Sequence, residues 1–80
     1  MDKEAISNDN NRKLYVLELL KKMCYGIDSD VVDMQEIYSQ SGTICAVEIE
    51  YSTGFRKTVN VKGDSPLAMV KEIIEKGHLG

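Results

Sequence analysis

The sequence predicts an α+β domain of two layers, with the element order α-β-β-β-α and both helices on one face of a three-stranded antiparallel sheet. Two stretches near the ends of the chain repeat their apolar residues with the period of a helix, and the stretch between them alternates apolar and polar residues as strands do. The chain of 80 residues is long enough for one modest core. We expect residues 1–11 to form a flexible N-terminal tail and residues 12–80 to form a single domain.

Residues 12–25 carry the pattern of the first helix. Asn10 or Asn11 can cap its beginning, and Gly26 can end it. We expect its apolar side to be centred on Val16. The other apolar side chains predicted to lie on that side are Tyr15, Leu17, Leu19, Leu20, Met23 and Cys24.

Three strands are expected over residues 31–38, 43–51 and 55–62. The second and third show the clearest alternation of apolar and polar residues. Turn-forming residues that include Gly42 separate the first two strands. The last two are separated by a loop of three residues, in which Gly54 can take the left-handed conformation that such loops require.

The short loop fixes the register of the second hairpin. It predicts four pairs on the inner face, the face that the helices cover: Tyr51 with Phe55, Ile49 with Lys57, Val47 with Val59 and Cys45 with Val61. On the outer face, Glu50 meets Arg56 in an exposed ion pair. Lys57 is the one charged residue that this hairpin places on the inner face, and its apolar stem can carry the ammonium past the sheet edge.

The first hairpin is less well specified by its sequence. Its turn residues predict inner-face pairs of Tyr38 with Cys45 and of Met34 with Ile49. The same register turns Glu36 toward the inner face, which is unfavourable for a carboxylate. We therefore expect a β-bulge in the first strand.

The last helix has clear signals at both ends. Ser65 can cap it, Pro66 suits its first turn, and Gly77 can end it. Its apolar stripe consists of Met69, Val70, Ile73 and Ile74.

Charge is distributed unevenly along the chain. No Lys or Arg occurs between Lys22 and Arg56, whereas six acids do: Asp28, Asp30, Asp33, Glu36, Glu48 and Glu50. This segment therefore has a charge of −6, although the net charge of the whole chain is −3. If the segment forms one side of the molecule, it favours a basic partner over an acidic one.

The sequence shows no arrangement of residues that is typical of catalysis. Cys24 and Cys45 lie on apolar faces without a basic neighbour, as structural cysteines do. A single His argues against a zinc site, and the acids from Asp28 to Asp33 lack the spacing of a calcium loop. We expect a protein that is not an enzyme and binds no metal or cofactor. Without a membrane-length apolar run or a secretory signal, we also expect it in the cytoplasm, with no membrane partner.

The element order over residues 12–77 resembles that of the double-stranded RNA-binding domain, and residues 59–63, which precede the last helix, are similar to the same region of that family. Members of the family bind phosphates with a lysine cluster at the start of the last helix. Here residues 64–69 contain no basic residue, and the first one to follow is Lys71. The resemblance therefore implies an architecture, and nucleic-acid binding ranks last among the candidate functions.

The open face of the sheet is the candidate site. We expect an apolar cluster beside acids and one arginine, made of Asp33, Ile37, Ile44, Ala46, Glu48, Glu50 and Arg56. Such a surface is typical of contact with a protein, or with a second copy of the chain. The first hypothesis is a small non-catalytic module that binds a protein through this acidic face. The alternatives are an acidic phage or mobile-element inhibitor of the anti-CRISPR or anti-restriction type that imitates nucleic acid, and a solvated surface without a role.

Overall fold

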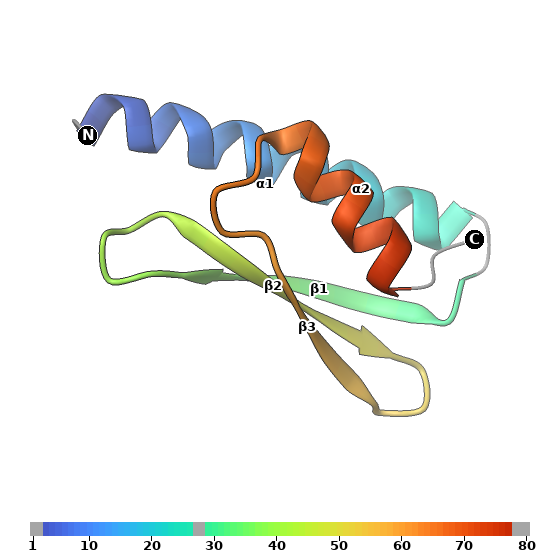
Figure 1. The fold of residues 1–80 in the computed structure, drawn as a ribbon. Coiled ribbons are helices and arrows are strands. Elements are labelled where there is room, and N and C mark those ends of the chain that lie inside the picture. Colours follow the sequence, from blue (N-terminus) through green and yellow to red (C-terminus); the bar gives the residue numbers. More distant parts are fainter. Residues whose placement is uncertain (1–2, 27–28, 78–80) are drawn as a thin grey trace.

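The structure, a computed structural model, describes residues 3–26 and 29–77, with side chains from residue 7 onward. Its elements are α1 (Lys3–Gly26), β1 (Val31–Tyr38), β2 (Ile44–Tyr51), β3 (Arg56–Asn60) and α2 (Pro66–Gly77). The strands form one antiparallel sheet in the order β1-β2-β3. Both helices lie on one face of this sheet (Figure 1), which confirms the predicted α+β fold. We call the face under the helices the inner face and the opposite one the outer face.

α1 begins much earlier than the sequence pattern indicates. Residues 3–11, which we expected to belong to a flexible tail, are helical. Asn10 therefore lies within the helix, and its side chain binds the first hairpin instead of capping α1. Its Nδ2 donates to the Gly42 carbonyl at 2.7 Å, and its Oδ1 accepts from the Ile44 amide at 3.1 Å. These two hydrogen bonds stabilise the helical conformation of the polar residues before Arg12, whose own sequence favours a helix only weakly.

The buried side of α1 is also rotated from the expected one. The buried residues are Leu17, Leu20 and Cys24, together with Lys13. They follow one another at helical spacing, but the centre of the row is not Val16, which is only partly buried. Three residues that we expected on the covered side are exposed: Tyr15, Leu19 and Met23. Of the elements that the structure describes, the sheet and α2 are the ones that cover α1, and these three residues lie on the part of the helix that neither covers.

The second hairpin has the predicted register. Val47 pairs with Val59, and Ile49 pairs with Lys57. The turn is closed by a hydrogen bond from the Tyr51 amide to the Phe55 carbonyl, at 2.8 Å. The other predicted end of the hairpin is present too, because the Val61 amide donates to the Cys45 carbonyl at 2.9 Å. Gly54 has a φ of 88°, the left-handed conformation that the loop requires.

The first hairpin agrees with the prediction only in part. Met34 pairs with Ile49 as expected, but Tyr38 pairs with Ile44 and not with Cys45. Two residues are left without a partner across the strands, Val32 in β1 and Cys45 in β2. We expected a bulge in β1, but the one at Val32 lies too early in the strand to change the position of Glu36, which pairs with Val47 on the inner face as the uncorrected register predicts. The bulge in β2 was not expected. The extra residue in β2 inverts the alternation beyond it, so the Ile44 side chain turns inward.

The core lies between the helices and the inner face. It consists of Leu17, Leu20, Cys24, Val31, Met34, Ile44, Val47, Ile49, Val59, Val61, Met69 and Ile73. At the start of α2, the Ser65 hydroxyl accepts a hydrogen bond from the Ala68 amide at 3.2 Å, which confirms the predicted cap. At its end, the Tyr51 hydroxyl donates to the Gly77 carbonyl at 3.0 Å, so the sheet satisfies part of the helix terminus.

Candidate protein-interaction surface

The outer face of the sheet is ordered in three rows that run across the strands. The rows are Asp33–Glu50–Arg56, Gln35–Glu48–Thr58 and Ile37–Ala46–Asn60. Each row has one residue from β1, one from β2 and one from β3, because the register of both hairpins places these positions opposite one another. Among the described residues, no helix or strand covers this face (Figure 1). We call these nine residues the outer sheet face.

Six of the seven residues predicted for the site belong to the outer sheet face. They are Asp33, Ile37, Ala46, Glu48, Glu50 and Arg56. The seventh, Ile44, was wrongly assigned: its side chain is 2% exposed and belongs to the core. The cause is the additional bulge at Cys45, which simple alternation along β2 does not reveal. The apolar part of the face is thus reduced to Ile37 and Ala46.

Arg56 moderates the acidity of this face. Its guanidinium lies 3.8 Å from Glu48 and 3.7 Å from Glu50, so one cation is shared between two carboxylates. All three side chains are substantially exposed to solvent, which makes each ion pair weak. The pairs therefore contribute little to folding and leave the three groups available to a partner.

Asp33 connects the outer sheet face with the helix layer. Its carboxylate accepts a hydrogen bond from the Gln35 side-chain amide at 3.2 Å and lies 3.7 Å from the Lys21 ammonium of α1. The hydrogen bond from Gln35, with smaller contributions from the Met34 amide and from Lys21, lowers the pKa of Asp33 below its ordinary value. Asp33 therefore remains a carboxylate throughout the neutral range.

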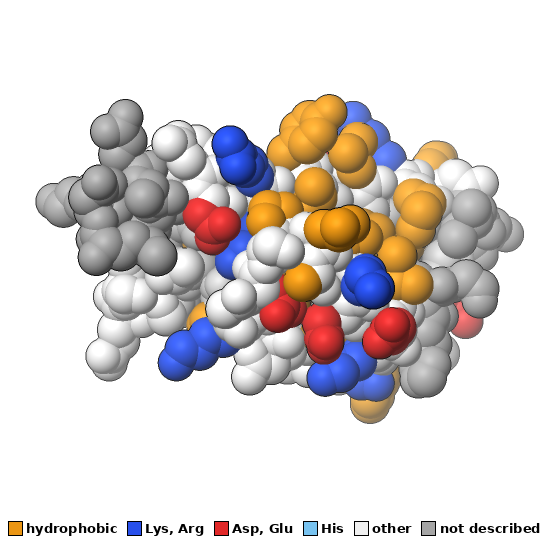
Figure 2. Space-filling model, turned by 45° about the horizontal axis from the view of Figure 1, so that its top comes forward, with side chains coloured by type: hydrophobic (Ala, Val, Ile, Leu, Met, Phe, Trp, Pro, Cys, Tyr) orange, Lys and Arg blue, Asp and Glu red, His pale blue; other side chains and the backbone are white. Residues whose placement is uncertain are grey.

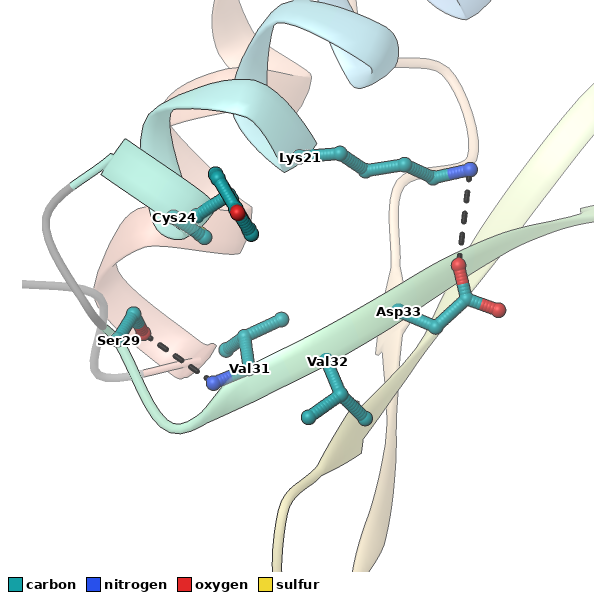
Figure 3. A pocket seen from close by; sticks show the side chains of 7 residues that line it. Lys21, Cys24, Ser29, Val31, Val32 and Asp33 are labelled. Carbon is teal, nitrogen blue, oxygen red and sulfur yellow. Dashed lines mark hydrogen bonds and ion pairs between the residues drawn. The ribbon is translucent and has the colours of Figure 1, made fainter.

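A groove of about 570 Å³ lies between the last turns of α1 and the beginning of β1. Figure 3 shows it from close by. Its lining consists of Lys21, Cys24, Tyr25, Ser29, Val31, Val32 and Asp33. This groove was not predicted from the sequence. The only signal for it was the pair of adjacent valines, which departs from strict alternation at the start of β1.

The groove has no group that suggests covalent chemistry. Burial raises the pKa of the Cys24 thiol above its usual value, and the side chain is almost completely covered. The Ser29 hydroxyl accepts a hydrogen bond from the Val31 amide at 3.2 Å, so it serves the turn into β1. Over residues 3–26 and 29–77, no three His, Cys, Asp or Glu side chains converge as metal ligands would.

A second apolar surface lies on the helix layer. Figure 2 shows hydrophobic side chains grouped on the face that the helices form, with basic side chains beside them. Among the side chains that the structure describes, the large exposed apolar ones of the two helices are Tyr15, Leu19, Met23 and Tyr25 of α1 and Leu67 of α2. The periodicity of α1 assigned the first three of these to the covered side. None of the described helices has the length and apolarity needed to cross a bilayer.

Asp28, one of the six acids of the charged segment, lies outside the described residues. Two of the other five, Asp30 and Glu36, are not part of the outer sheet face, so the acids of the segment do not all gather on one surface. Comparisons of the chain with protein-family models, with curated proteins and with solved structures gave no match.

Proposed function

We propose that this protein is a small non-catalytic interaction module that binds a protein partner through the outer sheet face. The observation that carries the proposal is the three-row arrangement, which brings nine side chains from three strands onto a surface that neither helix covers. An uncovered sheet face with an apolar end and a charged end suits protein contact, because the apolar part can be desolvated while the charges set orientation.

The charges of the face favour a partner with a basic surface. Asp33, Glu48 and Glu50 supply three carboxylates, against the single guanidinium of Arg56 within the nine residues. The Arg56 guanidinium lies near both Glu48 and Glu50, and it can leave either carboxylate to bind an acidic group of the partner. A second copy of the chain is a further candidate, since Arg56 of one copy can meet the carboxylates of the other in a symmetric contact.

A mimic of nucleic acid is the alternative suggested by the acidic segment between Lys22 and Arg56. It requires a broad surface of unneutralised acids that faces a basic groove. The outer sheet face carries only three acids, two of them beside Arg56. This mixed surface supports the interaction module more than the mimic.

The test begins with a partner recovered from a lysate of the source organism by the immobilised chain and then purified. Its affinity is measured by calorimetry for the wild type and for the double variant Glu48→Lys with Glu50→Lys. We expect the variant to bind at least about tenfold more weakly, since like charges then meet across the contact. A matched control, Glu72→Lys with Glu75→Lys, makes the same change of charge on α2 and is expected to bind as the wild type does.

Salt dependence separates the two hypotheses. A contact with an apolar end should lose little affinity between low and physiological salt, whereas binding by a mimic should weaken steeply. Circular dichroism of both variants establishes that they are folded. An unchanged affinity in the folded Glu48→Lys, Glu50→Lys variant would remove the outer sheet face from the binding site and overturn the proposal.

A further inference from the structure

The outer edge of β1 is a free strand edge. In the sheet order β1-β2-β3, β1 pairs with β2 alone, and no strand among the described residues lies on its other side. Backbone amides and carbonyls along such an edge offer hydrogen bonds to an added strand. Many proteins protect an edge with Pro or Lys, and β1 (VVDMQEIY) contains neither. Its protective features are the bulge at Val32 and the inward-facing Glu36, which leave the residues between them in regular strand conformation.

The groove between α1 and β1 lies at this edge. Val31 and Cys24 are buried, whereas Val32, the bulge residue, has 58% of its surface exposed. Tyr25, from the end of α1, is 91% exposed. Apolar groups from a helix and from an edge strand thus line one depression, whose volume of about 570 Å³ is ample for a large side chain.

Lys21 marks one end of the groove. The residue belongs to α1 in the helix layer, but its ammonium lies 3.7 Å from the carboxylate of Asp33, which belongs to the outer sheet face. The ion pair therefore passes around the free edge of β1 (Figure 3). Lys21 also contacts Glu18 at 3.2 Å, so it keeps a partner when an incoming chain displaces it from Asp33.

Charge indicates what kind of chain fits this edge. Asp30, Asp33 and Glu36 lie along β1 and the residue before it, and β1 contains no Lys or Arg. A basic segment would complement these acids, and an apolar side chain within it would fill the groove.

We propose that an extended, basic segment of a protein partner adds to β1 as a fourth strand and inserts one apolar side chain into the groove between α1 and β1. The proposal deepens the proposed function, because it rests on the protein being an interaction module and names the conformation and chemistry of the segment bound. Its site is nevertheless separate from the rows of the outer sheet face, apart from Asp33.

The probe is a peptide selected against the full chain from a displayed library of short random sequences. The selected peptides are expected to share an apolar residue flanked by Lys or Arg. When the synthetic peptide is added to the ¹⁵N-labelled protein, the amide signals of β1 and of the last turn of α1 should shift. Amide exchange along β1 should also slow, because added-strand hydrogen bonds protect free-edge amides.

Two variants test the groove itself. Tyr25→Ala and Val32→Asp should each weaken peptide binding by about tenfold or more. The first removes an apolar contact, and the second places a carboxylate where the apolar side chain of the peptide is to be buried. Tyr15→Ala is the matched control, because Tyr15 is an exposed tyrosine of the same helix outside the groove lining. It should leave the affinity unchanged. If Val32→Asp fails to fold, Tyr25→Ala decides, since that side chain makes almost no buried contact.

Failure of this proposal can be distinguished from failure of the proposed function. The Glu48→Lys, Glu50→Lys variant should still bind the peptide, because neither residue lines the groove. Peptide-induced shifts confined to the helix layer or the outer sheet face would overturn the edge-strand proposal. Equal affinities for Tyr25→Ala and the wild type would do the same. So would β1 shifts that depend on protein concentration without peptide, because a second copy would then occupy the edge.

Discussion

The ammonium of Lys57 in β3 donates a hydrogen bond to the main-chain carbonyl of Lys76 in α2, at 2.6 Å. A charged residue on the inner face of a sheet would ordinarily be unfavourable, but here its stem crosses to the end of the helix. The last carbonyls of a helix have no partner within it, and the helix dipole places partial negative charge there. The Lys57 ammonium binds one of these carbonyls and places a positive charge at the negative end of the helix. It thereby joins β3 to α2.

Replacing Lys57 by Met should therefore destabilise the domain while keeping the apolar stem. We expect a loss of about 0.5–1.5 kcal/mol in the free energy of unfolding, the net value of a typical hydrogen bond, because exposure to solvent weakens the contribution of the charge. Urea titration followed by circular dichroism measures it. Lys62→Met, at an exposed position, is the control and should change stability by less than about 0.5 kcal/mol. Equal stability of the two variants would contradict the capping role.

Asn10→Ala should detach the tip of the first hairpin from α1. The variant loses both hydrogen bonds, to the Gly42 carbonyl and from the Ile44 amide. We expect a cost of about 1–3 kcal/mol, because a partly buried amide is left without its acceptor. Asn11→Ala is the control: its side chain is exposed, and alanine favours the helix by a few tenths of a kcal/mol or more. Faster amide exchange at Ile44 in Asn10→Ala alone would confirm the attachment.

Lys13 and Asp9 should respond unequally to substitution. The Lys13 side chain is 2% exposed and depends on Asp9, whose carboxylate lies 3.0 Å from its ammonium. Asp9→Ala leaves a covered charge without its partner and should cost about 1–3 kcal/mol. Lys13→Met removes the charge and fills the same space, so it should be neutral or stabilising. Thermal unfolding of both variants decides, and an equal loss of stability in both would argue that the ion pair itself stabilises the fold.

Asp33 should give the stability a dependence on acid pH. Because its pKa in the folded state is lowered from the ordinary value of 3.8, its contribution to stability is fully present above about that pH. The contribution is lost as the pH falls through the lowered pKa, since the unfolded chain then binds the proton more readily. A ¹³C NMR titration of the carboxyl measures the pKa directly. In Asp33→Asn, the loss of stability below that pH should be smaller than in the wild type.

The register of the second hairpin could be predicted because it depends on residues that are close together in the sequence. A loop of three residues with Gly54 in the left-handed position leaves one register for the flanking strands, and the alternation of apolar residues selects the same one. Ala46, Glu48, Glu50 and Arg56 were placed on the correct face for this reason. Alternation along β1 and β2 decides the face wherever no bulge intervenes.

The features that the sequence did not reveal depend on contacts between distant residues. α1 extends over residues 3–11 where Asn10 binds a hairpin more than thirty residues away in sequence. Ile44 turns inward because Cys45 is an unpaired extra residue, and a bulge has no reliable signature in a single sequence. The groove arises from the distance between α1 and the edge of β1, which no local pattern encodes.

Apart from its core contacts, α1 binds the first hairpin through two polar side chains, Asn10 at the hairpin tip and Lys21 at the groove. These residues are about 16 Å apart along one uninterrupted helix. If a segment binds in the groove as proposed and displaces the end of α1, a helix that stays rigid passes part of that displacement to Asn10. We then expect a changed signal from the Ile44 amide, although the bound segment does not contact it.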